Sequence, residues 1–230
     1  MTTASRQLVV MARWPAPGRC KQRLARSCGS RSSAAAVQQR LMGHSLAVAA
    51  AAATHCSAAL SLAVDGLGPR ALRRWHGQLQ ANVKAPRFAM VPQAGGNLGC
   101  RMHHELPRCF VAGDEQVVLI GTDLPGLECR DLEAAFTRLG EAPVVLGPAV
   151  DGGYWLIGFN RRGFLGGSRR LMSGIAWGSD QVLKQTCDQA TQIGIPVTLL
   201  REQNDLDTAA GLTAWLRRRD RDDQGPSRWW

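Results

Sequence analysis

Short runs of consecutive apolar residues recur along the chain and alternate with longer segments of mixed polarity. The run Val117–Ile120 has three β-branched residues in four positions, which is typical of a strand buried on both faces of a parallel sheet. Comparable segments predict strands at 7–12, 58–64, 87–91, 143–146, 154–159 and 196–200. Only a turn separates 143–146 from 154–159, so we expect an antiparallel strand at this point.

The segments between these strands predict helices. Ser32 or Ser33 is expected to cap a long Ala-rich helix that ends near Ala53. Further helices are predicted at 69–79, 98–110, 129–139, 179–190 and 207–218. Two prolines and a glycine instead predict a loop without helix over residues 13–24. Strands that alternate with helices indicate an α/β fold with a doubly wound, mixed but mostly parallel sheet.

Length and composition are those of an ordinary soluble enzyme. The 230 residues are 45% apolar and 20% charged, so we expect one domain over residues 1–218 and a polar, frayed tail over 219–230. The 28 basic and 18 acidic side chains give a net charge of +10, which attracts anions. The arginines are spread along the chain without interleaved aromatic residues, so a small phosphate-bearing ligand is favoured over nucleic acid.

Cysteine usage and the absence of long apolar segments indicate a cytoplasmic protein with reduced thiols. The seven cysteines are an odd number, and we find neither a signal peptide nor a candidate membrane span. Cys100, His103 and His104 share one helical face near Cys109, which is a weak zinc pattern without a second pair of ligands. The preferred interpretation is buried cysteines and partly exposed histidines.

Asp123 follows the central apolar run directly, after Gly121 and Thr122. Ligands of open α/β sheets bind outside the carboxyl ends of the strands, which is where this carboxylate is expected. It could bind Mg²⁺ or Mn²⁺ that in turn holds a diphosphate. It could equally cap the helix that follows, and the segment alone does not decide between the two.

The loop after the first predicted strand favours a particular kind of nucleotide site. It contains neither Gly-x-Gly-x-x-Gly nor a P-loop, which disfavours a dinucleotide oxidoreductase and a P-loop enzyme. Gly18 allows a close backbone approach, and Lys21 and Arg23 point to one side of an extended segment. These side chains suit a polyphosphate, whereas the alternative is a solvated basic loop.

Polar residues also follow the strand predicted at 87–91. Gln93 and Asn97 carry amides that can contact the edge of a base, and Arg101 adds a positive charge nearby. Asn97 could equally be only the N-cap of the next helix. Both interpretations stay open at this stage.

Two further carboxylates follow predicted strands. Asp151 precedes Gly152 and Gly153, which give room for a ligand but also make an ordinary turn. Of the two acids after the last predicted strand, Asp207 is the better helix cap and Asp205 the better metal ligand. Acids at three strand ends and one basic loop together predict a site for a divalent cation and a nucleotide diphosphate.

An ordered set of motifs over about residues 7–215 resembles one bacterial family. The set consists of Pro15–Leu24, Gln93–Met102, Gly121–Pro125, Gly147–Gly158, Ile175–Trp177 and Asp205–Thr208. It resembles the glycosyltransferase-like proteins formerly classed as domain of unknown function 2064, also called arsenosugar-biosynthesis-type glycosyltransferases. The resemblance implies a Rossmann-like GT-A fold, a three-layer sandwich. A more distant similarity is to nucleotidyltransferases of molybdenum-cofactor and phospholactate chemistry.

The resemblance also implies roles for individual residues. Lys21 and Arg23 would contact the nucleotide phosphates, Asp123 would stand for the metal-binding acid, and Asp151 would lie by the acceptor or the metal. The chain departs from the family pattern where Gln22 replaces Thr, Asn97 replaces Asp, and Cys100 replaces an acidic residue.

Three functions follow as hypotheses. The first is a glycosyltransferase that uses Mg²⁺ or Mn²⁺, a nucleotide-sugar donor and a small-molecule acceptor. Asp123 would then hold the metal, and Asp151 would orient or deprotonate the acceptor hydroxyl. The second is a nucleotidyltransferase that joins an NTP to a phosphorylated small molecule and releases pyrophosphate. The third is a non-catalytic basic protein that binds nucleic acid, whose binding would depend steeply on salt.

Overall fold

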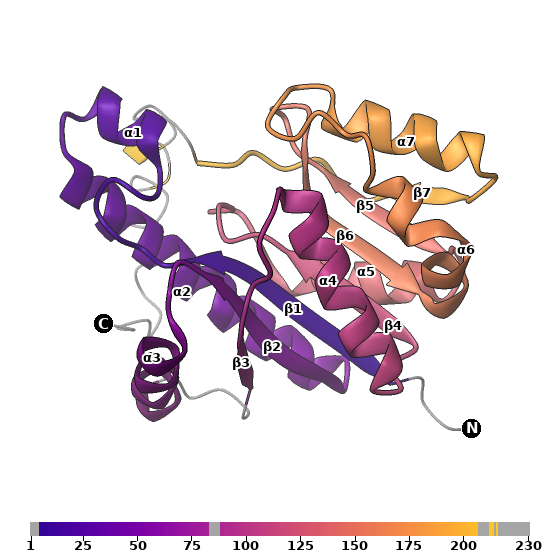
Figure 1. Cartoon of the computed structure of the whole chain (residues 1–230), viewed down its shortest axis with the longest axis horizontal. Coiled ribbons are helices and arrows are strands. Elements are labelled where there is room, and N and C mark those ends of the chain that lie inside the picture. The colour runs from indigo at the N-terminus through magenta and orange to yellow at the C-terminus, as the bar shows by residue number, and fades with distance from the viewer. Residues whose placement is uncertain (1–4, 83–87, 207–211, 214, 216–230) are drawn as a thin grey trace.

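The structure is a computed structural model that describes residues 5–82, 88–206, 212–213 and 215. Its centre is a seven-stranded sheet of order β3-β2-β1-β4-β6-β5-β7 (Figure 1). β6 is antiparallel to both of its neighbours, and every other pair is parallel. The strands are β1 Arg6–Arg13, β2 Ala58–Asp65, β3 Ala89–Pro92, β4 Gln116–Ile120, β5 Val144–Pro148, β6 Tyr154–Asn160 and β7 Val197–Leu199. The predicted mixed, mostly parallel sheet is therefore confirmed.

Helices cover both faces of this sheet and complete a three-layer sandwich. One face packs against α2, α3 and α5, and the other against α4, α6 and α7. The described helices are α1 Gln22–Ser27, α2 Arg31–His55, α3 Pro69–Asn82, α4 Leu98–Val111, α5 Cys129–Leu139, α6 Arg161–Leu171 and α7 Val182–Gln192. The architecture is the expected Rossmann-like fold.

The central strand β4 is buried along its whole length, as its apolar run predicts. Val118 and Ile120 contact the α2 and α5 side of the core, whereas Val117 and Leu119 contact the α4 and α6 side. Successive side chains of a strand point to opposite faces. A strand between two helical layers therefore needs apolar residues at every position.

Three local predictions are wrong. α1 begins at Gln22, inside the segment predicted to lack helix, because its breakers stop at Gly18 and Lys21 takes the left-handed conformation (φ 47°) before the helix. Lys21 and Arg23 therefore do not share the expected extended segment, because Arg23 is the second residue of α1. α2 is capped by Ser30, whose hydroxyl accepts a hydrogen bond from the Ser33 amide, and not by Ser32 or Ser33. α6 was not predicted, because three glycines within it weaken its helical pattern.

Two expectations lie mostly or wholly outside the described residues. The helix predicted at 207–218 is described only at 212–213 and 215, which are helical. The tail predicted at 219–230 is not described at all, so the domain boundary at 218 stays a prediction. None of the described helices is long and apolar enough to cross a membrane.

All seven cysteines lie among the described residues as free thiols. Burial raises the pKa of Cys109 to about 12, which leaves roughly one thiolate in ten thousand at pH 8. We expect iodoacetamide at pH 8 to label the exposed Cys28 and Cys100 well before Cys109 in the folded protein. Mass spectrometry of timed digests checks this order, and guanidinium-unfolded protein is the control. Equal rates for Cys100 and Cys109 in the folded state would contradict the burial.

Candidate functional site

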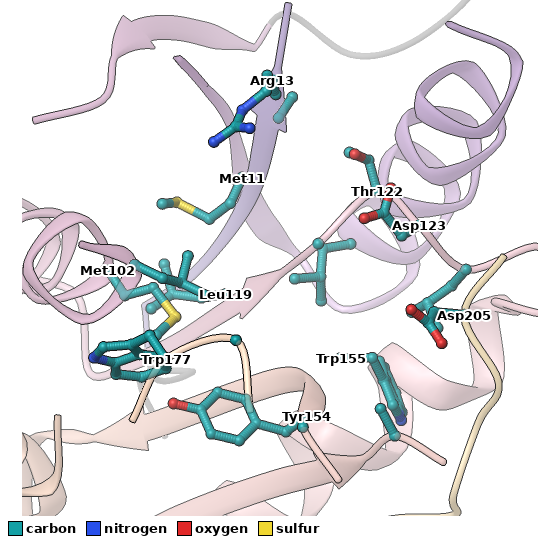
Figure 2. A pocket seen from close by; sticks show the side chains of 18 of the residues that line it. Met11, Arg13, Met102, Leu119, Thr122, Asp123, Tyr154, Trp155, Trp177 and Asp205 are labelled. Atoms are coloured by element: carbon teal, nitrogen blue, oxygen red, sulfur yellow. The ribbon is translucent and has the colours of Figure 1, made fainter. Parts of the chain in front are cut away.

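A cavity of about 530 Å³ opens beside the carboxyl ends of β1 and β4 (Figure 2). Seven of the predicted site residues line it: Lys21, Arg23, Gln93, Arg101, Asp123, Asp151 and Asp205. Gly18 and Asn97 are not among its lining residues. The structure therefore brings together side chains from segments that are up to 184 residues apart, from Lys21 to Asp205.

The basic loop and the central strand meet at an ion pair. The Lys21 ammonium lies 3.0 Å from Oδ1 of Asp123, and the Lys21 side chain is only 2% exposed. β1 and β4 are neighbours in the sheet, so the loop after β1 reaches the acid after β4. Lys21 also holds a left-handed backbone, a conformation that costs a residue with a Cβ about 1–2 kcal/mol. The fold therefore keeps this lysine in an unfavourable conformation beside the acid.

A hydrogen bond from α2 holds the loop that carries Asp123 in place. Thr122 is buried, and its hydroxyl oxygen accepts a hydrogen bond of 3.0 Å from the amide of Gln38. Half of the Asp123 side chain remains exposed. The carboxylate is thus fixed in place but reachable from the cavity.

Asp205 comes to the same side of the cavity through a backbone contact. The Leu206 amide donates to the Asp123 carbonyl at 2.9 Å, and Figure 2 shows both carboxylates at the same end of the cavity. The segment before Asp205 is anchored to buried Asp131 of α5, which accepts hydrogen bonds from Arg201 and Gln203. Two carboxylates from two loops therefore converge, which is a fitting donor set for a hard divalent cation.

The cavity lining also includes a network of polar side chains around Asp65. One of its oxygens lies 3.1 Å from Nη1 of Arg101 and 3.2 Å from Nε of Arg13. Gln93 donates both amide hydrogens to the carbonyls of Ala12 and Ala63, and its carbonyl oxygen accepts from Arg101. In this arrangement Gln93 orients the Arg101 guanidinium. Since the backbone accepts both amide hydrogens of Gln93, only the side-chain carbonyl oxygen of Gln93 could also face a ligand.

Asn97 caps α4, as one of its two interpretations predicts. Its side-chain oxygen accepts a hydrogen bond of 2.9 Å from the Cys100 amide. Gly18 has a φ of +78°, a conformation that favours glycine. The backbone of the loop therefore accounts for a glycine at this position. The contribution of Gly18 and Asn97 to nucleotide binding stays a prediction.

Asp151 lies in the turn between β5 and β6, and its Oδ1 accepts a hydrogen bond of 2.9 Å from the Gly153 amide. Gly152 has a φ of +85°, and a Cβ there would come 2.0 Å from the Asp180 carbonyl oxygen. Gly152 is thus explained by its left-handed backbone in the turn and by the close approach of Asp180. The turn also brings Asp151 to the cavity.

No role was predicted from the sequence for the residues at the apolar end of the cavity. Figure 2 shows Tyr154, Trp177 and Met102 at the end opposite Asp123 and Asp205. Burial raises the pKa of the Tyr154 hydroxyl, so it stays protonated and can act as a donor. The indole nitrogen of Trp177 is buried without a hydrogen-bond partner among the described residues. Both residues belong to quoted motifs, but nothing in those motifs states which way a side chain points.

The residues of the weak zinc pattern on α4 do not come together in space. Cys100 is exposed, which contradicts the expectation of a buried cysteine, because it lies in the first turn on the outer side of the helix. Cys109 is buried and His103 is partly exposed, as expected. These residues do not form a close group of metal-ligand atoms.

Comparison with known protein families identifies the family of this chain. Residues 46–179 match the family described as "Uncharacterized protein conserved in bacteria (DUF2064)". The chain belongs to this DUF2064 family. The match spans β4 and the Asp123 and Asp151 loops. No functionally curated protein matches the chain.

Solved structures extend the comparison of this DUF2064 chain to enzymes. A candidate nucleotide-diphospho-sugar transferase from Desulfovibrio desulfuricans G20 is 26% identical, with a TM-score of 0.81 over 98% of this chain and 92% of that one. A CMP:2-keto-3-deoxy-manno-octonic acid synthetase complexed with CTP is 14% identical (TM-score 0.57, 95% and 100% covered). Rv0371c from Mycobacterium tuberculosis H37Rv, in complex with manganese, is 18% identical (TM-score 0.52, 94% and 99% covered). At these lower identities the last two share the fold.

Proposed function

We propose that this DUF2064 protein is a divalent-metal-dependent glycosyltransferase that moves a sugar from a nucleotide-sugar donor to a small-molecule acceptor. The observation that carries the proposal is the Lys21–Asp123 ion pair, with Asp205 at the same end of the cavity. The similarity to a candidate nucleotide-diphospho-sugar transferase supports it. The resemblance to the arsenosugar-biosynthesis-type enzymes makes their chemistry the more specific proposal.

Asp123 and Asp205 are the proposed ligands for Mg²⁺ or Mn²⁺. A cationic group already lies 3.0 Å from Asp123, so this carboxylate is placed to hold a cation. When bound, the metal supplies positive charge that stabilises the leaving diphosphate. The manganese in the Rv0371c complex supports the choice of ion.

Lys21 and Arg23 are the proposed phosphate ligands. Both line the cavity, and Lys21, paired with Asp123, keeps the acid from repelling an anionic ligand. Arg101 also lines the cavity, and Asp65 and Gln93 fix its guanidinium. A nucleotide diphosphate in the cavity can thus be met by cationic side chains from two separate segments, the one after β1 and the start of α4.

Asp151 is the proposed acceptor-side residue. Its Oδ1 is held by the Gly153 amide, which orients the carboxylate for a hydrogen bond to an acceptor hydroxyl. Tyr154 and Trp177 line the same cavity and offer flat apolar surfaces, which suit the face of an acceptor molecule. The cavity is therefore proposed to have one end that binds the metal and the diphosphate and another end that binds the acceptor.

The similarity to a CTP-bound synthetase favours one alternative, a nucleotidyltransferase. The same lysine, arginine and aspartates would then hold an NTP, and the acceptor would carry a phosphate. The reactions differ in product, because only this alternative releases pyrophosphate from a free NTP.

A thermal-shift panel tests the proposal with NDP-sugars, NDPs and NTPs, each with and without Mn²⁺. A ligand at a hundred times its Kd stabilises the folded state by about 2.7 kcal/mol, which raises the Tm of a chain of this size by about 5–10 °C. We expect this shift for one NDP-sugar and its NDP, only with Mn²⁺.

The other outcomes of the panel are equally informative. A metal-dependent shift with an NTP alone, followed by pyrophosphate release, would replace the proposal by the nucleotidyltransferase. Binding of nucleic acid that weakens steeply with salt and persists in Asp123→Ala would favour the nucleic-acid-binding protein. No shift with any nucleotide would overturn the nucleotide site.

A further inference from the structure

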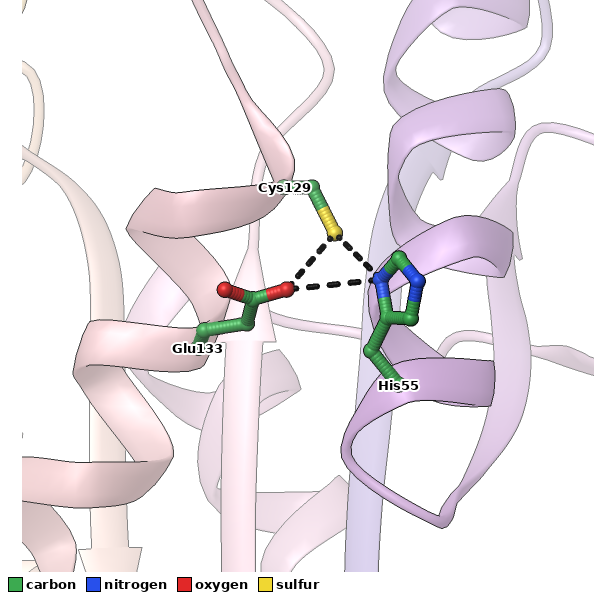
Figure 3. A group of neighbouring side chains, drawn as sticks. All are labelled: His55, Cys129 and Glu133. Atoms are coloured by element: carbon green, nitrogen blue, oxygen red, sulfur yellow. Dashed lines mark hydrogen bonds and ion pairs between the residues drawn. The ribbon is translucent and has the colours of Figure 1, made fainter.

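A group of metal-ligand side chains lies outside the cavity, where the end of α2 packs against α5 (Figure 3). It consists of His55, Cys129 and Glu133, and none of the three lines the cavity. From this group we infer a second, separate metal site that takes a zinc-class transition-metal ion. The inference does not depend on the proposed transferase activity.

The three ligand atoms have the spacing of a coordination shell. His55 Nδ1 lies 3.3 Å from Cys129 Sγ and 3.4 Å from Glu133 Oε1, and Sγ lies 3.2 Å from the same Oε1. In a tetrahedral zinc site with ordinary bond lengths, ligand atoms are about 3.3–3.6 Å apart. The edges of the triangle in Figure 3 are therefore close to those around a bound ion.

Well-anchored helices hold the three residues in place. Cys129 and Glu133 are four residues apart on α5 and so lie on one face of it. A reciprocal capping box between Glu128 and Asp131 fixes the first turn of α5. His55 is the last residue of α2, and the carbonyl of the next residue, Cys56, accepts a hydrogen bond from Arg6 of β1. The site needs little rearrangement to receive an ion.

The chemistry of the donor set selects the class of ion. A thiolate, an imidazole and one carboxylate suit Zn²⁺ and Co²⁺, whereas Mg²⁺ prefers oxygen ligands alone. Without metal, the Cys129 thiol donates a hydrogen bond to Glu133. On binding, the thiol proton leaves to solvent, and the ion bonds to Sγ, Nδ1 and Oε1, with water at the fourth position. His55 is exposed and Glu133 partly exposed, so an ion can enter from solvent.

The site joins two helices that also support the cavity. α2 carries Gln38, which holds Thr122, and α5 carries Asp131, which anchors the segment before Asp205. An ion that links the end of α2 to the start of α5 therefore stabilises the folded chain without touching a nucleotide.

Cobalt titration of the full chain under reducing conditions tests the inference. We expect one Co²⁺ per chain to give a thiolate-to-cobalt charge-transfer band, and Zn²⁺ to displace it and raise the Tm. Cys129→Ser should abolish the band, and His55→Ala should weaken Zn²⁺ binding by about 100-fold or more. These side chains are at least partly exposed, so both variants should fold, which circular dichroism verifies.

The controls separate this site from the rest of the molecule. Cys100→Ser and His104→Ala remove an exposed cysteine and histidine outside the group and should leave the band unchanged. Asp123→Ala should also leave it, because the cavity acids provide only oxygen. A band that persists in Cys129→Ser or disappears in Cys100→Ser, or no band at all, would overturn the inference.

Discussion

Asp123→Ala is expected to abolish the metal-dependent part of nucleotide binding, with an affinity at least about 100-fold weaker in the presence of Mn²⁺. Loss of a residue that only supports a metal ligand already costs about 10–100-fold in affinity, and Asp123 is proposed to contact the metal itself. Isothermal titration with the NDP found in the thermal-shift panel, with and without Mn²⁺, measures the loss. Unchanged affinity with Mn²⁺ would remove Asp123 from the site.

Two matched variants make this result specific. Asp123→Asn keeps an oxygen for the buried Lys21 ammonium, so it separates the loss of a metal ligand from general damage to the loop. Asp151→Asn removes another carboxylate of the same cavity, the one proposed to contact the acceptor. It should bind the nucleotide normally and lose sugar transfer. Equal loss of binding in Asp123→Asn and Asp151→Asn would argue against the proposed division of the cavity.

Asp131→Ala is expected to have the largest effect on stability, lowering the free energy of unfolding by about 2–4 kcal/mol. Asp131 is 5% exposed. It accepts hydrogen bonds from Arg201, Gln203 and the Glu128 amide, so one carboxylate caps α5 and anchors the segment before Asp205. The Tm should fall by about 5–15 °C. Metal affinity should fall as well, because Asp205 loses its support.

Glu141→Ala is the control for this loss. Glu141 forms an exposed ion pair with Arg138 at the end of α5, and such pairs contribute about 0–1 kcal/mol. Calorimetry on both variants compares a buried acid in the first turn of α5 with an exposed acid that follows the end of the same helix. An Asp131→Ala protein as stable as Glu141→Ala would show that the buried network is not a support.

The fold was largely predictable because its strands need continuous apolar runs. β1 and β4 are buried on both faces, and a pattern without polar positions is enough to indicate this. α6 follows β6 without a loop and contains Gly163, whose Cβ would lie 2.0 Å from the Pro143 carbonyl oxygen. Such a glycine is required by packing between distant segments, which a local pattern does not report.

The part of the candidate site that could be predicted consists of side chains that directly follow strands, because the end of a strand fixes where the next residues lie. Asp123, Asp151 and Asp205 follow strands of one sheet, and the structure brings them to one cavity. The Lys21–Asp123 contact depends on β1 lying beside β4, an order that the sequence does not state. The role of Gln93 could not be predicted from the sequence either, because its amide donates to backbone carbonyls of β1 and β2.

The ion pair at the centre of the cavity has a consequence for the order in which ligands bind. Lys21 serves as a tethered counterion to Asp123, so a metal ion that arrives alone must compete with an ammonium that the chain itself provides. A diphosphate gives that ammonium a new partner and adds its own oxygens to the metal. The two ligands should therefore bind with positive cooperativity, each raising the affinity for the other by the same factor.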